Sequence, residues 1–308
     1  MSIYISGSLA YDRIMNFPDK FSNHILPDKL HILNVCFLVN DLEERFGGTA
    51  GNIAYSLALL EENATILAAA GNDFERYQKW LHKHGISQDG IQLVQDVPTA
   101  SAYITTDHAD NQITAFNPGA MNTATNGSQS QFETKDSLAI VSPGNLEDMQ
   151  KFPEIYRGKN IPFIFDPGQN IPAFSGAQLK SMIQGSTILI ANDYELSLIM
   201  EATGLDKKGL LQLTSAIITT LGEQGCLITN ASSEQEIPAV KVQNAQDPTG
   251  CGDAFRSGLI KGLCRGKDLK ESAQMGATCA SFCVEHKGTQ EHRFTLDQFW
   301  NRHASAYQ

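Results

Sequence analysis

The chain has 308 residues, of which 42% are hydrophobic and 19% charged, a composition typical of a globular protein. Its formal net charge of −11 at pH 7 argues against a nucleic-acid surface, which would need a stripe of Lys and Arg. An acidic chain can still bind a nucleotide through local backbone dipoles and a metal ion. No apolar run approaches the ~18 residues of a membrane span, and the first residues lack a signal segment, so we expect a cytoplasmic protein without a membrane partner.

Strand and helix patterns alternate from the start of the chain. Residues 3–5 form a short apolar run, 52–61 carry apolar residues at helical spacing, 64–70 return to an apolar run, and 73–84 resemble a second helix. Further buried strands are predicted at 138–142, 161–166, 187–191 and 216–221. This alternation indicates an α/β fold with a doubly wound, mostly parallel sheet covered on both faces. We expect residues 1–308 to form one domain of this class.

Two segments, 10–46 and 98–118, do not follow this alternation of strands and helices. Residues 101–106 and 112–116 alternate between apolar and polar side chains on either side of a polar turn, which predicts hairpins outside the main sheet. From the pattern alone they are a pair of edge hairpins. Residues 122–131 are polar and low in complexity, which predicts a surface loop.

The most informative segment runs from Asp247 to Asp253 and reads Asp-Pro-Thr-Gly-Cys-Gly-Asp, directly before a helical pattern. Glycines at a helix start allow a tight turn, so the N–H groups of Gly250, Cys251 and Gly252 can point at an anion that the helix dipole also favours. Asp253 lies at the mouth of this phosphate cradle, where a carboxylate can accept a proton from an attacking hydroxyl. The segment therefore predicts phosphoryl transfer, although an ordinary helix N-terminus with an Asp cap has the same pattern.

This segment resembles the C-terminal signature of the PfkB, or ribokinase-like, family of carbohydrate and nucleoside kinases. Residues 47–52 (Gly-Gly-Thr-Ala-Gly-Asn) resemble the family's N-terminal Gly-Gly-x-x-x-Asn element. Residues 192–195 (Asn-Asp-Tyr-Glu) resemble its Asn-x-x-Glu element, and 220–225 (Thr-Leu-Gly-Glu-Gln-Gly) its nucleotide-side turn. The four elements follow the family's order and the resemblance covers essentially the whole chain. It implies a ribokinase-like fold with a small β-strand lid over the substrate.

The sequence departs from the family pattern at two positions of the cradle. Pro248 stands where Thr is commoner, but it precedes the cradle and removes no N–H group from it. Cys251 stands where Ala or Gly is commoner, and it is either a small packed side chain or a redox-sensitive thiol beside the phosphate site. The six cysteines of the chain include no Cys-x-x-Cys pair, so we expect reduced thiols.

The resemblance implies a role for each group around the acceptor. Asp253 would be the base that deprotonates the acceptor hydroxyl, while the amides of Gly250, Cys251 and Gly252 would neutralise the charge on the transferred phosphoryl group. The hydroxyl groups of a sugar would be held by Asp12, Gly48 and Asn52. Ordinary alternatives remain open, since Asp12 can cap a turn, Asn52 can cap the helix that follows it, and Glu195 can sit in a solvated first helical turn.

On the nucleotide side, the resemblance implies ATP as co-substrate. Mg²⁺ would bridge its phosphates through water held near Asn192 and Glu195, because Mg²⁺ sheds its hydration shell reluctantly. Asp247 and Thr249 resemble positions near a monovalent-cation site, which K⁺ could occupy. Asp166, in an Asp-Pro-Gly sequence at a predicted strand end, can face the phosphates or form a turn. The predicted ATP-binding residues are Asn192, Thr220, Gly222 and Gly225.

Softer matches at 116–121, 165–169 and 288–292 resemble the adenosine-kinase-like branch of the family. A nucleoside needs an aromatic or apolar slot for its base, which Phe116 and Met121 can provide beside Asn117, unless they pack in the core. Phe37 and Phe46 are further candidates for this slot. We therefore expect an adenosine kinase, as a monomer or homodimer. A ribokinase or other sugar kinase is the alternative, and a non-catalytic nucleotide-binding regulator ranks below both.

Overall fold

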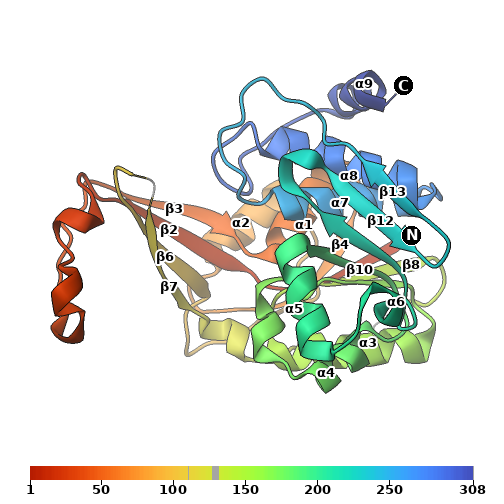
Figure 1. Ribbon diagram of the computed structural model, residues 1–308, viewed down its shortest axis with the longest axis horizontal. Coiled ribbons are helices and arrows are strands. Elements are labelled where there is room, and N and C mark those ends of the chain that lie inside the picture. The colour runs from red at the N-terminus through yellow and green to blue at the C-terminus, as the bar shows by residue number, and fades with distance from the viewer. Residues whose placement is uncertain (110, 127–131, 308) are drawn as a thin grey trace.

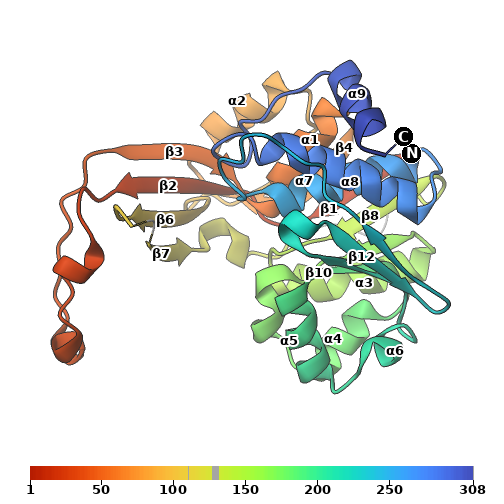
Figure 2. The same cartoon turned by 45° about the horizontal axis from the view of Figure 1, so that its top comes forward.

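The computed structural model of the protein describes residues 1–109, 111–126 and 132–307. A large sheet with helices on both faces forms the body, and a smaller sheet extends from it to one side (Figure 1). Both termini lie on the body, on the side away from the smaller sheet (Figures 1 and 2). The surface loop predicted at 122–131 falls in part on residues 127–131, which lie outside the described residues.

The large sheet has nine strands within the described residues, in the order β13-β12-β11-β10-β9-β8-β1-β4-β5. All pairs from β11 to β5 are parallel, whereas β12 and β13 add an antiparallel hairpin at one edge. Every strand predicted for this sheet is present, but β5, β12 and β13 were not predicted. The bounds are β1 Ser2–Ser6, β4 Ala64–Ala70, β5 Ile91–Leu93, β8 Ser137–Val141, β9 Phe163–Phe165, β10 Ser186–Asn192, β11 Thr214–Thr220, β12 Cys226–Asn230 and β13 Glu234–Ile237.

Helices cover both faces of the large sheet, as predicted for a doubly wound fold (Figure 2). Alternate residues of β1 show why, because Ile5 packs with Ile53 of α1 and Leu259 of α7, while Tyr4 packs on the opposite face with Phe152 of α3. One face carries α1 Thr49–Leu59, α2 Glu75–Lys83, α7 Cys251–Cys264 and α8 Leu269–Cys283. The other carries α3 Leu146–Lys159, α4 Gly176–Ile183 and α5 Asp193–Thr203, and the chain also forms α6 Lys207–Leu210 and α9 Leu296–Tyr307.

The small sheet, which we call the lid sheet, has the order β3-β2-β6-β7. Its strands are β2 Ala10–Asn16, β3 Leu42–Gly47, β6 Ala100–Thr106 and β7 Gln112–Asn117. The pairs β2–β3 and β6–β7 are antiparallel, and the parallel pair β2–β6 joins them. Segments 10–46 and 98–118 thus form strands outside the main sheet, as predicted. Between β2 and β3 the chain makes an arm with two 3₁₀ turns that projects away from the body (Figure 1).

Two helices begin earlier than the sequence predicted, and both starts matter for the site. The helix α7 begins at Cys251, so Asp253 lies in its first turn and not before it. The helix α1 begins at Thr49, so Asn52 lies inside it and does not cap it. Its side chain is therefore free to contact groups other than the helix end. In the described part of the chain, no helix is long and apolar enough to cross a membrane.

Candidate active site

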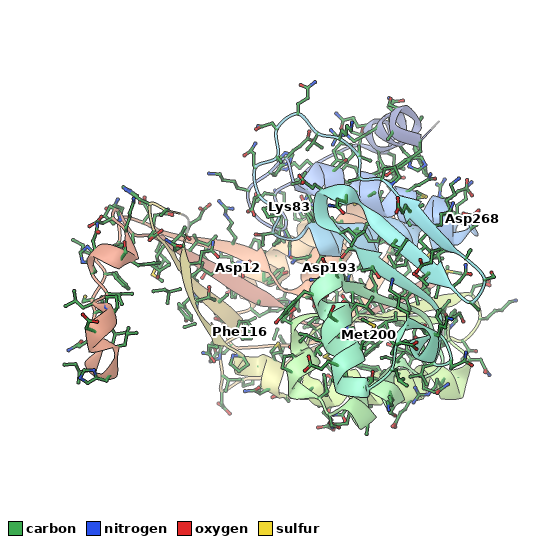
Figure 3. All side chains as sticks on the ribbon, in the orientation of Figure 1. Asp12, Lys83, Phe116, Asp193, Met200 and Asp268 are labelled. Atoms are coloured by element: carbon green, nitrogen blue, oxygen red, sulfur yellow. The ribbon has the colours of Figure 1, made fainter. Side chains whose placement is uncertain are left out.

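A cavity of about 1510 Å³ lies between the lid sheet and the carboxyl ends of the parallel strands. Figure 3 places Asp12 and Phe116 on the lid sheet beside the body and Asp193 at the start of α5 on the other side. Elements far apart in the sequence therefore meet around one space. The predicted residues that line it are Asp12, Gly48, Asn52, Phe116, Met121, Asn192, Glu195, Thr220, Gly222, Gly225, Thr249, Gly250, Cys251, Gly252 and Asp253.

The phosphate cradle forms at the N-terminus of α7. Gly250 caps this helix in the left-handed region, with φ of 80°, where a side chain would be strained. The N–H of Cys251 donates to the carbonyl of Pro248 at 3.1 Å, so this predicted cradle amide is already bonded. The N–H groups of Gly250 and Gly252 have no acceptor among the described residues. Two of the three predicted amides are thus free to meet an anion at the positive end of α7.

Asp253 lies beside this cradle, and one of its carboxylate oxygens has a defined partner. The Nδ2 of Asn52 donates to Oδ2 of Asp253 at 2.8 Å. Burial raises the pKa of Asp253 from 3.8 to about 6, although the charge of Arg256 and the Asn52 hydrogen bond act in the opposite direction. A carboxylate with a pKa near 6 is mostly ionised at neutral pH and still a useful proton acceptor. Asp253 therefore has the properties of a general base.

Asp12 enters the cavity from β2 of the lid sheet, opposite Arg45 on β3. Burial also raises its pKa from 3.8 to about 6, while the charge of Arg45 lowers it. A Cβ at Gly47 would approach Oδ2 of Asp12 to 2.5 Å, so glycine at 47 makes room for this carboxylate. No described residue donates a hydrogen bond to it, and both oxygens are free to accept bonds from a ligand.

Gly48 supports the same wall of the cavity through its backbone. It caps α1 with φ of 88°, and a Cβ there would meet the carbonyl oxygen of Ser8 at 2.6 Å and the nitrogen of Ala10 at 2.7 Å. Only glycine allows this approach between α1 and the start of β2. The turn brings Asn52, one helical turn later, to face Asp253.

The Asn-x-x-Glu element on the nucleotide side is a capping box at the start of α5. Glu195 N–H donates to Oδ1 of Asn192 at 2.7 Å, and Asn192 N–H donates to Oε2 of Glu195 at 2.9 Å. Burial raises the pKa of Glu195. The next strand ends at Thr220, and Gly225 follows with φ of 97°, where a Cβ would lie 2.0 Å from the carbonyl oxygen of Ile237. These contacts give the nucleotide side of the cavity a fixed backbone.

The side chains around the cavity fit a metal ion that arrives with the nucleotide better than one held by the protein. Among the described residues there is no group of three His, Cys, Asp or Glu side chains that could hold one. Glu195 uses one oxygen for the capping box, which fits a hydrated Mg²⁺ bound mainly by nucleotide phosphates better than direct ligation. Asp247 accepts the N–H groups of Thr249 and Gly288, at 2.9 and 3.0 Å. Burial would raise the pKa of Asp247, but these bonds and the charge of Arg45 lower it overall.

One charged pair at the site was not predicted. The guanidinium of Arg256 binds the carboxylate of Asp166 through both Nε and Nη2, the latter at 2.7 Å from Oδ1, and its Nη1 donates to the carbonyl of Gly252 at 2.9 Å. Asp166, which also lines the cavity, therefore anchors the cradle to the end of β9. An Arg three residues after Asp253, on the same helix face, is the sequence signal that could have indicated it.

Of the residues predicted to form a slot for a base, only Phe116 and Met121 line the cavity. Phe116 is 50% exposed. Asn117 does not line it, because its Oδ1 accepts the N–H of Gly119 in a local turn at 3.1 Å. Phe37 and Phe46 are also absent from the cavity wall. Phe37 packs with its ring tilted against Phe17 and Phe21 in the arm, and Phe46 packs against Tyr11, Tyr77 and Trp80.

Comparisons with known proteins agree with this geometry. The chain matches the family described as pfkB family carbohydrate kinase over residues 12–295. A nucleoside kinase of Methanocaldococcus jannaschii is 30% identical over 271 residues, which cover 87% of this chain and 89% of that relative. The structure of Burkholderia thailandensis nucleoside kinase in complex with inosine has a TM-score of 0.88 at 37% identity, covering 99% of this chain and 98% of that one. This chain is a kinase and belongs to the pfkB family of carbohydrate kinases.

Proposed function

We propose that this protein transfers the γ-phosphoryl group of ATP to the hydroxymethyl group of a nucleoside. The observation that carries the proposal is the meeting of Asp12, Asp253 and the free amides of Gly250 and Gly252 around one cavity. Two similar proteins support the acceptor class, since both are named nucleoside kinases and one was solved with inosine. Another structure of that kinase, 38% identical with a TM-score of 0.86, is described as a complex with ADP-inosine.

The chemistry follows from the positions of these groups. The hydroxyl oxygen of the acceptor attacks the γ-phosphorus of ATP while its proton passes to the free oxygen of Asp253, and ADP leaves with the electrons of the broken P–O bond. The amides of Gly250 and Gly252 and the α7 dipole stabilise the charge on the transferred group. When bound with ATP, Mg²⁺ would supply further neutralisation of the phosphate oxygens, and Glu195 and Asn192 would hold its water ligands.

The acceptor would lie between the lid sheet and α1. Asp12 would accept hydrogen bonds from sugar hydroxyls, since a carboxylate without other donors can accept several. The second N–H of the Asn52 amide would donate to the acceptor, because its first N–H is bonded to Asp253. Phe116 and Met121 would cover the base. Adenosine is the acceptor favoured by the sequence, and inosine is the second candidate because a similar kinase was solved with it.

An ATP-consumption assay with several acceptors tests the proposal. Adenosine, inosine, cytidine, ribose and fructose are compared with the same purified protein. We expect kcat/KM for the preferred nucleoside to exceed that for ribose at least about tenfold, because ribose cannot fill the apolar slot. Phosphorylation of ribose or fructose alone would overturn the nucleoside assignment. Equal rates for adenosine and inosine would support the nucleoside class and reject adenosine specificity.

A further inference from the structure

A chain of buried hydrogen bonds lies behind Asn52 and involves residues with no role in the proposed reaction so far. Trp80 Nε1 donates to Oε1 of Gln290 at 2.9 Å. Gln290 Nε2 then donates to Oδ1 of Asn52 at 3.0 Å and to the hydroxyl of Tyr77 at 2.6 Å. The chain continues through Asn52 Nδ2 to Asp253 at 2.8 Å. It connects α2, the segment after α8, α1 and α7, and it ends on the base of the proposed reaction.

The direction of these hydrogen bonds is set at the far end of the chain. An indole N–H can only donate, so the atom of Gln290 that faces Trp80 must be its oxygen. The amide nitrogen of Gln290 then faces Asn52, which must present its own oxygen in return. Asn52 is left with its nitrogen toward Asp253. The donor at Trp80 therefore reinforces the orientation of Asn52 that the ionised Asp253, which can only accept hydrogen bonds, also requires.

Tyr77 closes the chain on its other side. Its hydroxyl accepts from Gln290 and donates to the carbonyl of Gly47, the last residue of β3, at 2.8 Å. Both N–H groups of the Gln290 amide thus have an acceptor, and Gln290 is only 1% exposed. A Cβ at Gly51 would lie 1.9 Å from the Tyr77 hydroxyl, so glycine at this position leaves room for the bond. The third glycine of residues 47–52 is explained by the same chain.

We propose that Gln290 is a positioning residue which, held by Trp80 and Tyr77, keeps the N–H group of Asn52 on one oxygen of Asp253 and leaves the other oxygen for the acceptor proton. The inference rests on the kinase function proposed above and deepens it. If the Asn52 amide turned over, its oxygen would face the Asp253 carboxylate, and two acceptors would repel each other. Asp253 would then hold its proton more tightly and be ionised in a smaller fraction of molecules at a given pH.

Other charged and titratable groups also act on Asp253, and of these only the Tyr77 hydroxyl contacts Gln290, as a member of the same hydrogen-bond chain. They are Arg256 on the same helix, Asp166 after β9, Asp12 on the lid sheet, Tyr77 on α2, and the thiols of Cys251 and Cys283. A shift in the pKa of Asp253 that appears when only Gln290 or Trp80 is changed is therefore attributable to the hydrogen-bond chain.

The decisive variant is Gln290→Met, which keeps the length of the side chain without its polar atoms. We expect the acidic limb of the pH profile of kcat/KM to move upward by about one pH unit, because the carboxylate loses a charge-assisted hydrogen bond. At pH 7 kcat should fall about twofold with KM for ATP unchanged, because a smaller fraction of Asp253 is ionised. Trp80→Phe should shift the limb in the same direction by less, since the aromatic packing and the bond from Gln290 to Tyr77 remain.

Trp300→Phe is the matched control, because Trp300 packs against Phe299 and Arg265 and takes no part in the hydrogen-bond chain from Trp80 to Asp253. Its pH profile should equal that of the wild type. A purely structural role of Gln290 would lower the melting temperature or the active fraction without moving the limb, and that result would overturn the proposal. If Gln290→Met does not fold, an unshifted limb in Trp80→Phe would overturn it equally.

A direct titration separates this inference from the proposed function. Carbon-13 NMR of labelled Asp carboxyls, with the Asp253 signal assigned by its loss in Asp253→Asn, follows ionisation without substrates. We expect the midpoint for Asp253 to rise in Gln290→Met as the kinetic limb does. If the wild type phosphorylates nucleosides but the Asp253 midpoint is unshifted in Gln290→Met, the inference is overturned and the proposed function stands. A shifted midpoint in a protein that phosphorylates only sugars would retain the inference and remove the nucleoside assignment.

Discussion

Two carboxylates with a pKa raised to about 6 face the same cavity, but they belong to regions built in different ways. Asp253 lies on α7 in the body, and one of its oxygens is held by Asn52. Asp12 lies on the lid sheet, where β7 is exposed along its whole length, and no described residue donates to its carboxylate. In the proposed reaction, the body would orient Asp253 to accept a proton, while Asp12 on the lid sheet would accept hydrogen bonds from the hydroxyl groups of the acceptor.

The largest effect that this difference predicts is on turnover. Asp253→Asn removes the proton acceptor and keeps the amides of Gly250 and Gly252, so kcat should fall by about a thousandfold while the Kd for ATP stays within about twofold. Single-turnover assays and calorimetric titration with a nonhydrolysable ATP analogue measure the two quantities. Turnover close to that of the wild type would mean that another group accepts the proton. Asp253 and Asp12 would then not differ in the way proposed here.

The second prediction concerns the rigidity of the body. Arg256→Met leaves Asp166, which is 2% exposed, without its ion-pair partner, and the unfolding free energy should fall by about 3 kcal/mol. Urea denaturation measures the change, and Arg265→Met, at an exposed position at the far end of the same helix, should change it by less than about 0.5 kcal/mol. Equal losses of unfolding free energy in Arg256→Met and Arg265→Met would mean that the ion pair does not anchor the cradle.

The third prediction concerns the lid carboxylate. Asp12→Asn replaces one acceptor oxygen by a donor and should raise KM for the acceptor about tenfold, with kcat and KM for ATP little changed. Steady-state kinetics with the preferred nucleoside measures the split. Asp41→Asn, at an exposed position next to the lid sheet, is the control and should leave all constants unchanged. A collapse of kcat as large as that in Asp253→Asn would show that Asp12 takes part in proton transfer.

Local sequence motifs predicted the glycine turns of the site and the parallel strands of the body well. The Gly-rich turn before α7 and the glycines of residues 47–52 act through backbone geometry, which short sequences encode directly. The parallel strands were also recognisable, because buried strands have continuous apolar runs. The edge hairpin β12–β13 was missed since β13 is mostly exposed and reads Glu-Gln-Glu-Ile, without an apolar run.

The contacts that orient the site could not be predicted in this way. Gln290 lies 210 residues after Trp80 and 213 after Tyr77, and the three side chains meet only after α1, α2 and the segment behind α8 have packed together. Phe46 was a candidate for the base slot because aromatic side chains suit both stacking on a base and core packing. The structure gives it three aromatic neighbours away from the cavity wall. Composition alone cannot distinguish these two environments.

The smallest effect is on the free energy of unfolding, and its size depends on pH. Burial raises the pKa of Asp253 from 3.8 to about 6, so its protonated form favours the folded state. This contribution is complete below the unfolded pKa and is lost as the pH rises through about 6. Above that pH the wild type keeps an unfavourable buried charge, which Asp253→Asn lacks. The variant should therefore be more stable than the wild type by about 1 kcal/mol near pH 8.

Urea denaturation of both proteins between about pH 5 and 8 measures this difference. It should shrink toward the acidic end, because the wild-type carboxyl becomes protonated there and resembles the amide. The hydrogen bond from Asn52 is retained in both proteins, since the amide that replaces the carboxylate still offers an oxygen. A difference that is constant with pH would mean that ionisation is not its cause. A stabilisation that grows with pH would show that the body tolerates a destabilising charge at the point where the proposed reaction requires a base.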